Sequence, residues 1–278
     1  MTPTPSTEQA CADAADLISQ SDGLLITAGA GIGIDSGLPD FRGDAGFWRA
    51  YPALGNRHLR FTEIANPKAF HQHPDLAWGF YGHRLQLYRT TVPHAGFTLL
   101  NRIASRIPNG AFVFTSNVDG QFQRSGVPDD RVVECHGSIE KLQCLSACGQ
   151  PTWSAHEFVP TVDVENCILT SALPTCPTCG GIARPNILMF GDCDWDAAHA
   201  EQQERRLQAW LARQNRTVVF EIGAGTAIPK VRLFGEQLSR PLIRLNPSES
   251  TVGMRRDIGI PLGALEGIAA IAAALDSI

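Results

Sequence analysis

The sequence predicts an α/β protein in which helices cover both faces of a parallel sheet. Short apolar runs typical of buried strands lie at residues 24–27, 111–115, 131–135, 217–222 and 242–245. The helix-like segments lie at residues 8–19, 68–106 (with a break near Pro93), 198–213 and 229–239. Strands that alternate with helices favour a parallel sheet, because a parallel connection needs a crossover long enough to hold a helix.

Two further stretches complete the expected fold. Residues 258–275 are strongly apolar but carry Pro261 and Glu266, so we expect a packed terminal helix and not a membrane span. Residues 138–190 contain paired cysteines, several prolines and no long periodic pattern. We interpret this stretch as a module inserted between the elements of the sheet.

Length and composition indicate a globular protein. The 278 residues correspond to about two domains, with 44% hydrophobic and 18% charged residues. The net charge of −5 argues against nucleic-acid binding through phosphate neutralisation. Residues 1–5 have no basic region followed by an apolar run, so we expect no signal peptide and a cytoplasmic, membrane-free protein. In that compartment, eight cysteines indicate a metal site or free thiols before disulfides.

A glycine-rich turn follows the first predicted strand, with Gly29, Ala30 and Gly31 leading to Gly33. Glycines at the end of a strand allow backbone N–H groups to approach a pyrophosphate. The pattern does not fit G-x-G-x-x-G, because Ile34 stands where the third glycine belongs, so a plain tight turn is the alternative. The next segment, 36–43, holds a carboxylate and a guanidinium two residues apart, which favours a ligand site.

Polar side chains also follow the next two strands. Asn117 and Asp119 come after strand 111–115, and His136 follows strand 131–135. The carboxyl ends of parallel strands meet at one edge of a sheet, so these groups should converge on the glycine turn. Taken singly, each has a plainer interpretation as turn chemistry or a packed histidine. Their joint occurrence favours a site.

Four cysteines have the spacing of a zinc site. Cys144-x3-Cys148 and Cys176-x2-Cys179 are separated by residues 149–175, and four thiolates in two short loops suit tetrahedral zinc. Four protein ligands close the coordination shell, so the zinc should be structural. A redox pair or unrelated thiols are the alternatives. The other cysteines are expected to be packed or exposed thiols: Cys11, Cys135, Cys167 and Cys193.

Several motifs together resemble the sirtuins, a family of NAD-dependent protein deacylases, in their bacterial type. Residues 29–43 resemble the signature G-A-G-x-S-x-x-S-G-I-P-D-F-R-G, and residues 115–119 resemble T-Q-N-x-D. His136-Gly137 resembles the family's H-G, residues 184–192 resemble R-P-x-V-V-x-F-G-E, and the paired cysteines resemble its zinc ribbon.

The resemblance implies roles for individual residues. His136 would be the general base, with Asn117 and Asp119 holding the nicotinamide ribose. Asp40 would meet the nicotinamide carboxamide, Phe41 would cover the cleaved position, and Arg42 would face the phosphates. Residues 188–192 would pair with the substrate backbone as an added strand. The remaining NAD-binding residues would be Gly29, Ala30, Gly31, Ser116, Gly223, Gly225 and Asn246, the last at the adenosine ribose.

The helix before the second strand carries a further resemblance. Tyr81 and Arg84 are three residues apart, so they share a helix face. An ordinary amphipathic helix is the plain alternative. The Tyr-x-x-Arg spacing resembles the sirtuins that remove succinyl and malonyl groups, in which these two side chains hold the distal carboxylate of the acyl group.

The resemblance also implies a domain division and an activity. A Rossmann-like NAD-binding domain would comprise residues 1–43, 92–137 and 190–278. A smaller domain would combine a helical part, 44–91, with a zinc-ribbon part, 138–189. The activity would be lysine deacylation of proteins, either deacetylation or desuccinylation and demalonylation, with release of nicotinamide and O-acyl-ADP-ribose. Protein mono-ADP-ribosyl transfer or NAD hydrolysis on the same scaffold is the alternative.

The sequence departs from the family pattern in four places. Gly33 stands where the family has Ser, Ser116 where it has Gln, and Phe122 where it has His. Gly223-Ala224-Gly225 stands where G-T-S is expected. These positions cluster around the expected cofactor site.

Overall fold

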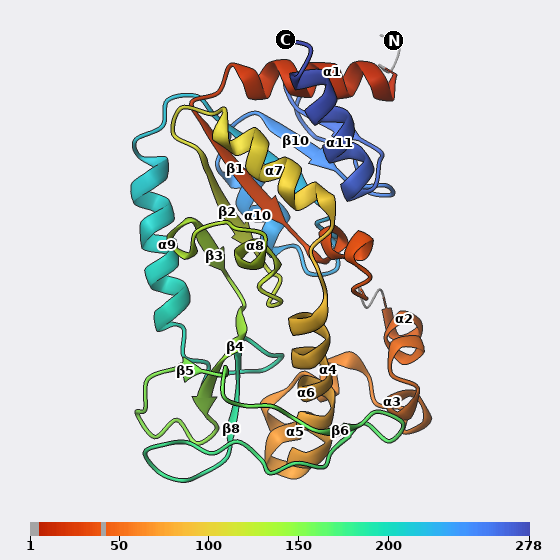
Figure 1. The fold of residues 1–278 in the computed structure, drawn as a ribbon, viewed down its shortest axis with the longest axis vertical. Coiled ribbons are helices and arrows are strands. Elements are labelled where there is room, and N and C mark those ends of the chain that lie inside the picture. Colours follow the sequence, from red (N-terminus) through yellow and green to blue (C-terminus); the bar gives the residue numbers. More distant parts are fainter. Residues whose placement is uncertain (1–5, 40–42) are drawn as a thin grey trace.

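The computed structural model describes residues 6–39 and 43–278 and confirms the α/β architecture (Figure 1). Within these residues, the main sheet has the strand order β11-β10-β9-β1-β2-β3, and every pair is parallel. The strands span, in chain order, β1 Gly23–Ala28, β2 Ala111–Thr115, β3 Val132–Glu134, β9 Thr217–Ile222, β10 Leu242–Leu245 and β11 Ile258–Ile260.

Helices cover both faces of this sheet, as the alternation along β1 requires. Leu24 and Ile26 pack against one layer of helices, whereas Leu25 packs against the other. The first layer holds α1 Thr7–Ser19, α7 Ala95–Ser105 and α11 Ala264–Leu275. The second holds α9 Ala198–Leu211 and α10 Lys230–Gln237. Because β1 is covered on both faces, all its residues are buried and apolar residues occupy nearly all of it.

A smaller unit lies at the other end of the molecule (Figure 1). Its helices are α2 Gly43–Ala50, α3 Pro52–Asn56, α4 Phe61–Ile64, α5 Pro67–Gln72 and α6 Pro74–Thr90. Its sheet has the antiparallel order β5-β4-β8, and a separate hairpin joins β6 to β7. These strands are β4 Gly137–Cys144, β5 Trp153–Ser154, β6 Val162–Asp163, β7 Ile168–Leu169 and β8 Ala183–Ile187.

The hydrophobic cores divide in the same way. The core of the smaller unit draws its buried residues from 47–88 and 139–189, together with Leu38 and Val118. The two cores that flank the main sheet share none of these residues. This separation supports the division that we propose: residues 1–43, 92–137 and 190–278 in the larger domain, and 44–91 with 138–189 in the smaller.

The predicted elements needed two corrections. The third strand begins at Val132, because a short 3-10 turn, η2 Asp129–Arg131, precedes it. The single terminal helix expected at 258–275 is wrong: Ile258–Ile260 is an edge strand paired with β10, and the helix starts at Ala264. A Cβ at Gly259 would lie 2.3 Å from the Ser250 carbonyl oxygen, so glycine lets this strand approach the preceding loop.

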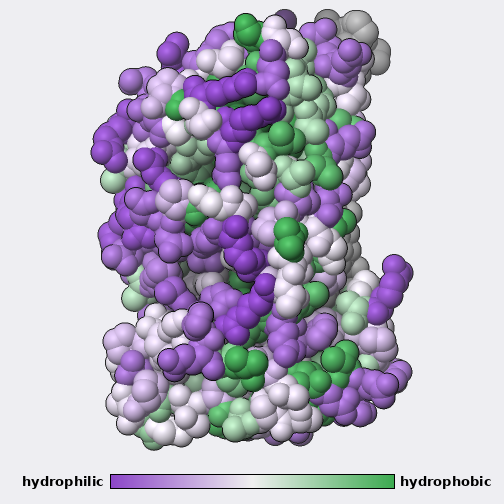
Figure 2. Space-filling model, viewed as in Figure 1, coloured by the Kyte–Doolittle hydropathy of each residue, from purple (hydrophilic) through white to green (hydrophobic). Residues whose placement is uncertain are grey.

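Across residues 6–39 and 43–278, the helices fall short of the length and apolar character that a bilayer crossing needs. On the face shown in Figure 2, apolar residues form small groups between polar ones.

Candidate active site

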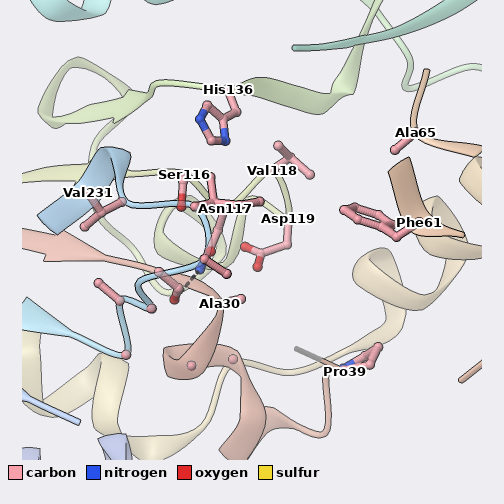
Figure 3. Close-up of a pocket in the computed structure, with 18 of the residues that line it drawn as sticks. Ala30, Pro39, Phe61, Ala65, Ser116, Asn117, Val118, Asp119, His136 and Val231 are labelled. Carbon is pink, nitrogen blue, oxygen red and sulfur yellow. Dashed lines mark hydrogen bonds between the residues drawn. The ribbon is translucent and has the colours of Figure 1, made fainter. Parts of the chain in front are cut away.

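A cavity of about 850 Å³ lies at the carboxyl ends of β1, β2 and β9, where the main sheet meets the smaller unit (Figure 3). Three loops that directly follow these strands line it, at residues 29–31, 116–119 and 223–226. The smaller unit contributes residues from α4, α6 and the end of β8. The volume lies within the range of small-molecule sites, and the position is where open parallel sheets bind ligands.

Two glycine loops meet at the floor of the cavity. The N–H of Gly29 donates to the Ile222 carbonyl at 3.0 Å, and that of Gly31 donates to the Gly223 carbonyl at 3.0 Å. A Cβ at Gly29 would lie 2.7 Å from Ala224 Cα, and one at Gly31 would lie 2.7 Å from Gly223 Cα. The glycines therefore permit a backbone contact that side chains would block. The resulting cradle of two glycine loops lines the cavity, but the Gly29 and Gly31 N–H groups are engaged within the protein and do not face a pyrophosphate as expected.

Asn117 and Asp119 follow β2 as expected. The Asn117 side chain donates to the Gly29 carbonyl at 3.1 Å, which ties the end of β2 to the glycine turn. The Asp119 Oδ1 accepts from the Gln121 N–H at 2.9 Å, and burial raises the pKa of this carboxyl. Both residues line the cavity together with Ser116, and the three are seen side by side in Figure 3.

His136 lies in the same cavity, just beyond β3 (Figure 3). Burial, and next the positive charge of Lys230, lower the pKa of its imidazole below the usual value. The ring is therefore neutral at pH 7 and able to accept a proton. Its backbone carbonyl accepts from the Leu188 N–H at 2.9 Å, which joins it to the segment after β8.

Of the other predicted NAD-binding residues, some line the cavity and the rest lie outside the part of the chain that the structure describes. Gly223 and Gly225 line the cavity, and so does Asn246. The Asn246 amide nitrogen donates to the Ala224 carbonyl at 3.0 Å, and its oxygen accepts from the Ser248 N–H at 3.1 Å. Asn246 thus ties the loop that follows β9 to the loop that follows β10. Three predicted residues lie outside the described residues: Asp40, Phe41 and Arg42.

Residues 188–192, the segment expected to pair with the substrate backbone, do not form a strand, because β8 ends at Ile187. The N–H groups of Leu188 and Phe190 already donate to the carbonyls of His136 and Ala65, both at 2.9 Å. These two groups are therefore engaged within the protein. Leu188, Met189 and Phe190 still line the cavity, so the segment forms part of its wall.

Tyr81 and Arg84 lie on one face of α6, and both line the cavity. Both side chains are buried. Burial raises the pKa of Tyr81 to about 12, so its hydroxyl stays protonated. The structure thus brings the pair together with His136 in one cavity.

Two departures from the family pattern have different consequences. Phe122 is buried in the core and its ring centroid lies 5.1 Å from that of Phe97, so it does not face the cavity. Gly33 does line the cavity, and a Cβ there would lie 3.1 Å from Gln121 Nε2. The Gln121 oxygen accepts from the Ser36 hydroxyl at 2.7 Å, so Gln121 fills the space beside Gly33.

The four paired cysteines form the expected metal site. Their sulfur atoms all lie within 4.8 Å of one another, and the pairs Cys144–Cys179 and Cys148–Cys176 are each 3.6 Å apart. Zinc bound tetrahedrally at about 2.3 Å would place sulfurs roughly 3.8 Å apart, so the site fits zinc. The other four cysteines are unpaired thiols, with Cys193 exposed and the rest buried.

Sequence reasoning missed three residues in or near the site. Glu249 lines the cavity, accepts from the Thr226 hydroxyl at 3.1 Å and pairs with Arg232 at 3.1 Å. Tyr88 lines the cavity one helical turn beyond Arg84 on α6. Glu134 is buried at the end of β3, two residues before His136. A single glutamate or tyrosine carries no motif, so only the fold reveals these positions.

Glu134 predicts a pH-dependent stability. Burial raises the pKa of its carboxyl from 4.5 to about 7, only partly opposed by hydrogen bonds from Ser138 and Gln203. A raised pKa means that the folded state binds the proton more tightly, so stability is highest below pH 4.5 and declines as the pH rises through 7, by roughly 3 kcal/mol. Glu134→Gln mimics the protonated form at every pH, so its melting temperature relative to wild type should increase from pH 5 to pH 8.

Thermal unfolding across this pH range measures the effect. Glu201→Gln, at an exposed position of α9, is the control, and its difference from wild type should stay near zero. A pH-independent difference for Glu134→Gln would contradict the assignment.

The fold and the site define a class: an α/β protein with a dinucleotide-type cavity and a separate four-cysteine metal site. The chain belongs to the Sir2 family, whose model matches residues 29–211.

Relatives are similar over most of the chain. It is 28% identical over 231 residues to the NAD-dependent protein deacylase of Aquifex aeolicus, covering 82% of this chain and 85% of the relative. It is 28% identical over 243 residues to the mitochondrial NAD-dependent protein deacylase sirtuin-5 of Canis lupus familiaris, covering 82% and 73%.

A solved Sir2 homologue–NAD complex superposes with a TM-score of 0.69 at 23% identity, covering 95% of this chain and 93% of the homologue. A point mutant of a Sir2 homologue, solved as its ADP-ribose complex, superposes with a TM-score of 0.69 at 23% identity, covering 95% and 96%. At this level of identity, the likeness shows the fold.

Proposed function

We propose that this protein is an NAD-dependent protein lysine deacylase. The observation that carries the proposal is the convergence in one cavity of the glycine cradle, the His136 imidazole and the Tyr81–Arg84 pair. Family membership and relatives named as NAD-dependent protein deacylases support it. When bound, NAD supplies the ADP-ribosyl group that takes up the acyl group, with release of nicotinamide and O-acyl-ADP-ribose.

The residues of the chain divide the work between them. The loops at 29–31 and 223–225 would hold the dinucleotide, and Asn246 would support its adenosine side through the loop contacts described above. Asn117 and Asp119 would position the nicotinamide ribose. The neutral imidazole of His136 would accept a proton from a ribose hydroxyl, which makes that oxygen a better nucleophile. Asp40, Phe41 and Arg42 keep the roles that the family resemblance implies.

Product analysis separates this function from the alternative. The protein is incubated with NAD and an acetylated or succinylated peptide, and the products are weighed by mass spectrometry. Loss of the acyl mass from the peptide with formation of O-acyl-ADP-ribose supports deacylation. A gain of ADP-ribose on protein, or free ADP-ribose with the peptide unchanged, would support ADP-ribosyl transfer or NAD hydrolysis instead. The cavity position of His136 favours deacylation, because simple ADP-ribosyl transfer needs no acyl chemistry.

We also propose that the substrate is an acyl-lysine of a cytoplasmic protein and that the chain works in the cytoplasm. None of the eight cysteines forms a disulfide, as the reducing cytoplasm favours. Zinc would remain structural, since four thiolates leave no open coordination position.

The position of Arg84 in the cavity leads us to expect a preference for acyl groups that carry a carboxylate. We propose that its guanidinium binds the distal carboxylate of a succinyl or malonyl group with help from the Tyr81 hydroxyl. A charge-assisted pair in an apolar pocket is worth about 1.5–3 kcal/mol, so Arg84→Met should lower kcat/KM for a succinyl-lysine peptide by about tenfold or more. Activity on the acetyl-lysine peptide of the same sequence should be kept or increased, and it serves as the internal control. An acetyl preference in the wild type would contradict the proposal.

A further inference from the structure

Tyr88 lies one helical turn beyond Arg84 on α6, outside the Tyr-x-x-Arg spacing. Its hydroxyl accepts from Arg84 Nε at 2.9 Å and from Arg84 Nη2 at 2.5 Å. Tyr88 and Arg84 are both buried, at 5% and 8% exposure, and both line the cavity. The hydroxyl thus occupies the edge of the guanidinium formed by Nε and Nη2. The same edge can bind a carboxylate through two parallel hydrogen bonds.

Among the residues that the structure describes, several aromatic rings lie close to the Arg84 guanidinium. Its Cζ lies 5.2 Å from the Phe80 ring centroid, 5.7 Å from that of Tyr81 and 5.2 Å from that of Tyr88. Aromatic faces stabilise the positive charge but do not replace hydrogen-bond acceptors for the individual N–H groups. In such a setting, a donor that loses its acceptor is costly, because an apolar acyl group excludes the water that would replace it.

We propose that Tyr88 is a specificity-determining residue of the acyl site, and that its hydroxyl serves as an acceptor for two Arg84 donors when the bound acyl group has no carboxylate. This inference rests on the proposed deacylase function. With a succinyl group, the carboxylate supplies acceptors to the guanidinium. With an acetyl group, Tyr88 keeps two Arg84 donors satisfied, so binding the neutral acyl group costs the site little. Tyr88 therefore broadens an arginine-containing site toward neutral acyl groups.

The variant Tyr88→Phe isolates this contribution, because it removes the hydroxyl and keeps the ring and the charge of Arg84. Asp119 interacts electrostatically with both Tyr88 and Arg84, and the substitution leaves Asp119 and Arg84 in place. For the acetyl peptide, kcat/KM should fall by about tenfold, mostly through KM. For the succinyl peptide of the same sequence it should change by less than about threefold, so the succinyl-to-acetyl ratio rises.

Tyr51→Phe is the matched control. The Tyr51 hydroxyl lies 2.9 Å from His83 Nδ1 in the same aromatic cluster and interacts electrostatically with Arg84, but Tyr51 does not line the cavity. This variant also loses one buried hydroxyl, and its succinyl-to-acetyl ratio should equal that of the wild type. Melting temperatures and NAD affinity of both variants show whether the fold is kept.

Two results would overturn the inference. An equal loss on both peptides would mean that Tyr88 only supports the helix. A loss confined to the succinyl peptide would mean that the hydroxyl binds the substrate carboxylate directly. If the wild type removes neither acyl group, the proposed function fails, and calorimetric affinities of the acetyl and succinyl peptides for wild type and Tyr88→Phe then test the role of Tyr88 alone: an unchanged ratio of the two affinities overturns it.

Discussion

Replacing His136 by alanine should lower kcat/KM for deacylation by at least about 10²-fold while leaving NAD affinity nearly unchanged. Loss of a general base costs about 10²–10⁴ in rate. The cradle that would hold the dinucleotide is made of backbone at residues 29–31 and 223–225, which the substitution leaves intact. The pKa of the imidazole is lowered by burial and by Lys230, so the wild-type base is already neutral at pH 7.

The measurement pairs peptide deacylation kinetics with calorimetric NAD binding. His199→Ala is a matched control, because His199 lies on α9, contacts Gln203 at 3.2 Å and does not line the cavity. Near-wild-type turnover in His136→Ala would remove His136 from the base role. A parallel loss of NAD binding would show that its contribution is to the cofactor and not to the acyl chemistry.

The larger features of the fold could be predicted because each has a local physical signal. The run 24–27 is apolar on both of its faces, so it predicted a strand buried between two helix layers, and β1 is such a strand. The glycines at 29 and 31 indicated a close backbone approach, but their partner, the loop at 223–225, is almost 200 residues away. No local pattern reveals which loop a glycine turn will meet.

The errors have equally physical causes. The segment Ile258-Gly259-Ile260 resembles the start of a terminal helix in the sequence, because three residues are too few to show a period of two. Pairing with β10 decides its conformation, and that is a tertiary contact. Phe122 illustrates the converse: its difference from the family pattern suggested a changed cofactor site, yet the side chain packs into the core. A motif position therefore shows its role only when the direction of its side chain is known.

Tyr88 and Glu134 show what a motif leaves out. The Tyr-x-x-Arg spacing ends at Arg84, so it does not include the hydroxyl that binds the guanidinium from the next turn. Glu134 would be an ordinary polar residue in an edge strand, but α9 covers β3 and buries its carboxyl. Burial depends on which distant parts of the chain pack over a residue, and a single sequence does not show this.

Replacing Cys176 by serine should abolish zinc binding and lower the melting temperature by about 10 °C or more. Metal binding to sites of this kind is coupled to folding, since the ligands are brought together only in the folded state. Cys144 ends β4, while Cys176 and Cys179 precede β8, so the metal would join the two strands at their far end. Elemental analysis of the wild-type protein should find one zinc per chain.

Activity should fall in Cys176→Ser only as a consequence of this loss. The opposite end of β4 follows His136, and β8 leads into the cavity wall at Leu188, so loosening the two strands would displace the base and that wall. Cys193→Ser is the control, because this exposed thiol lies outside the cluster, and it should keep both zinc and melting temperature. Purified, unchelated wild-type protein without zinc would contradict the assignment. A zinc-free variant with wild-type stability would show instead that the strands hold the base in place without the metal.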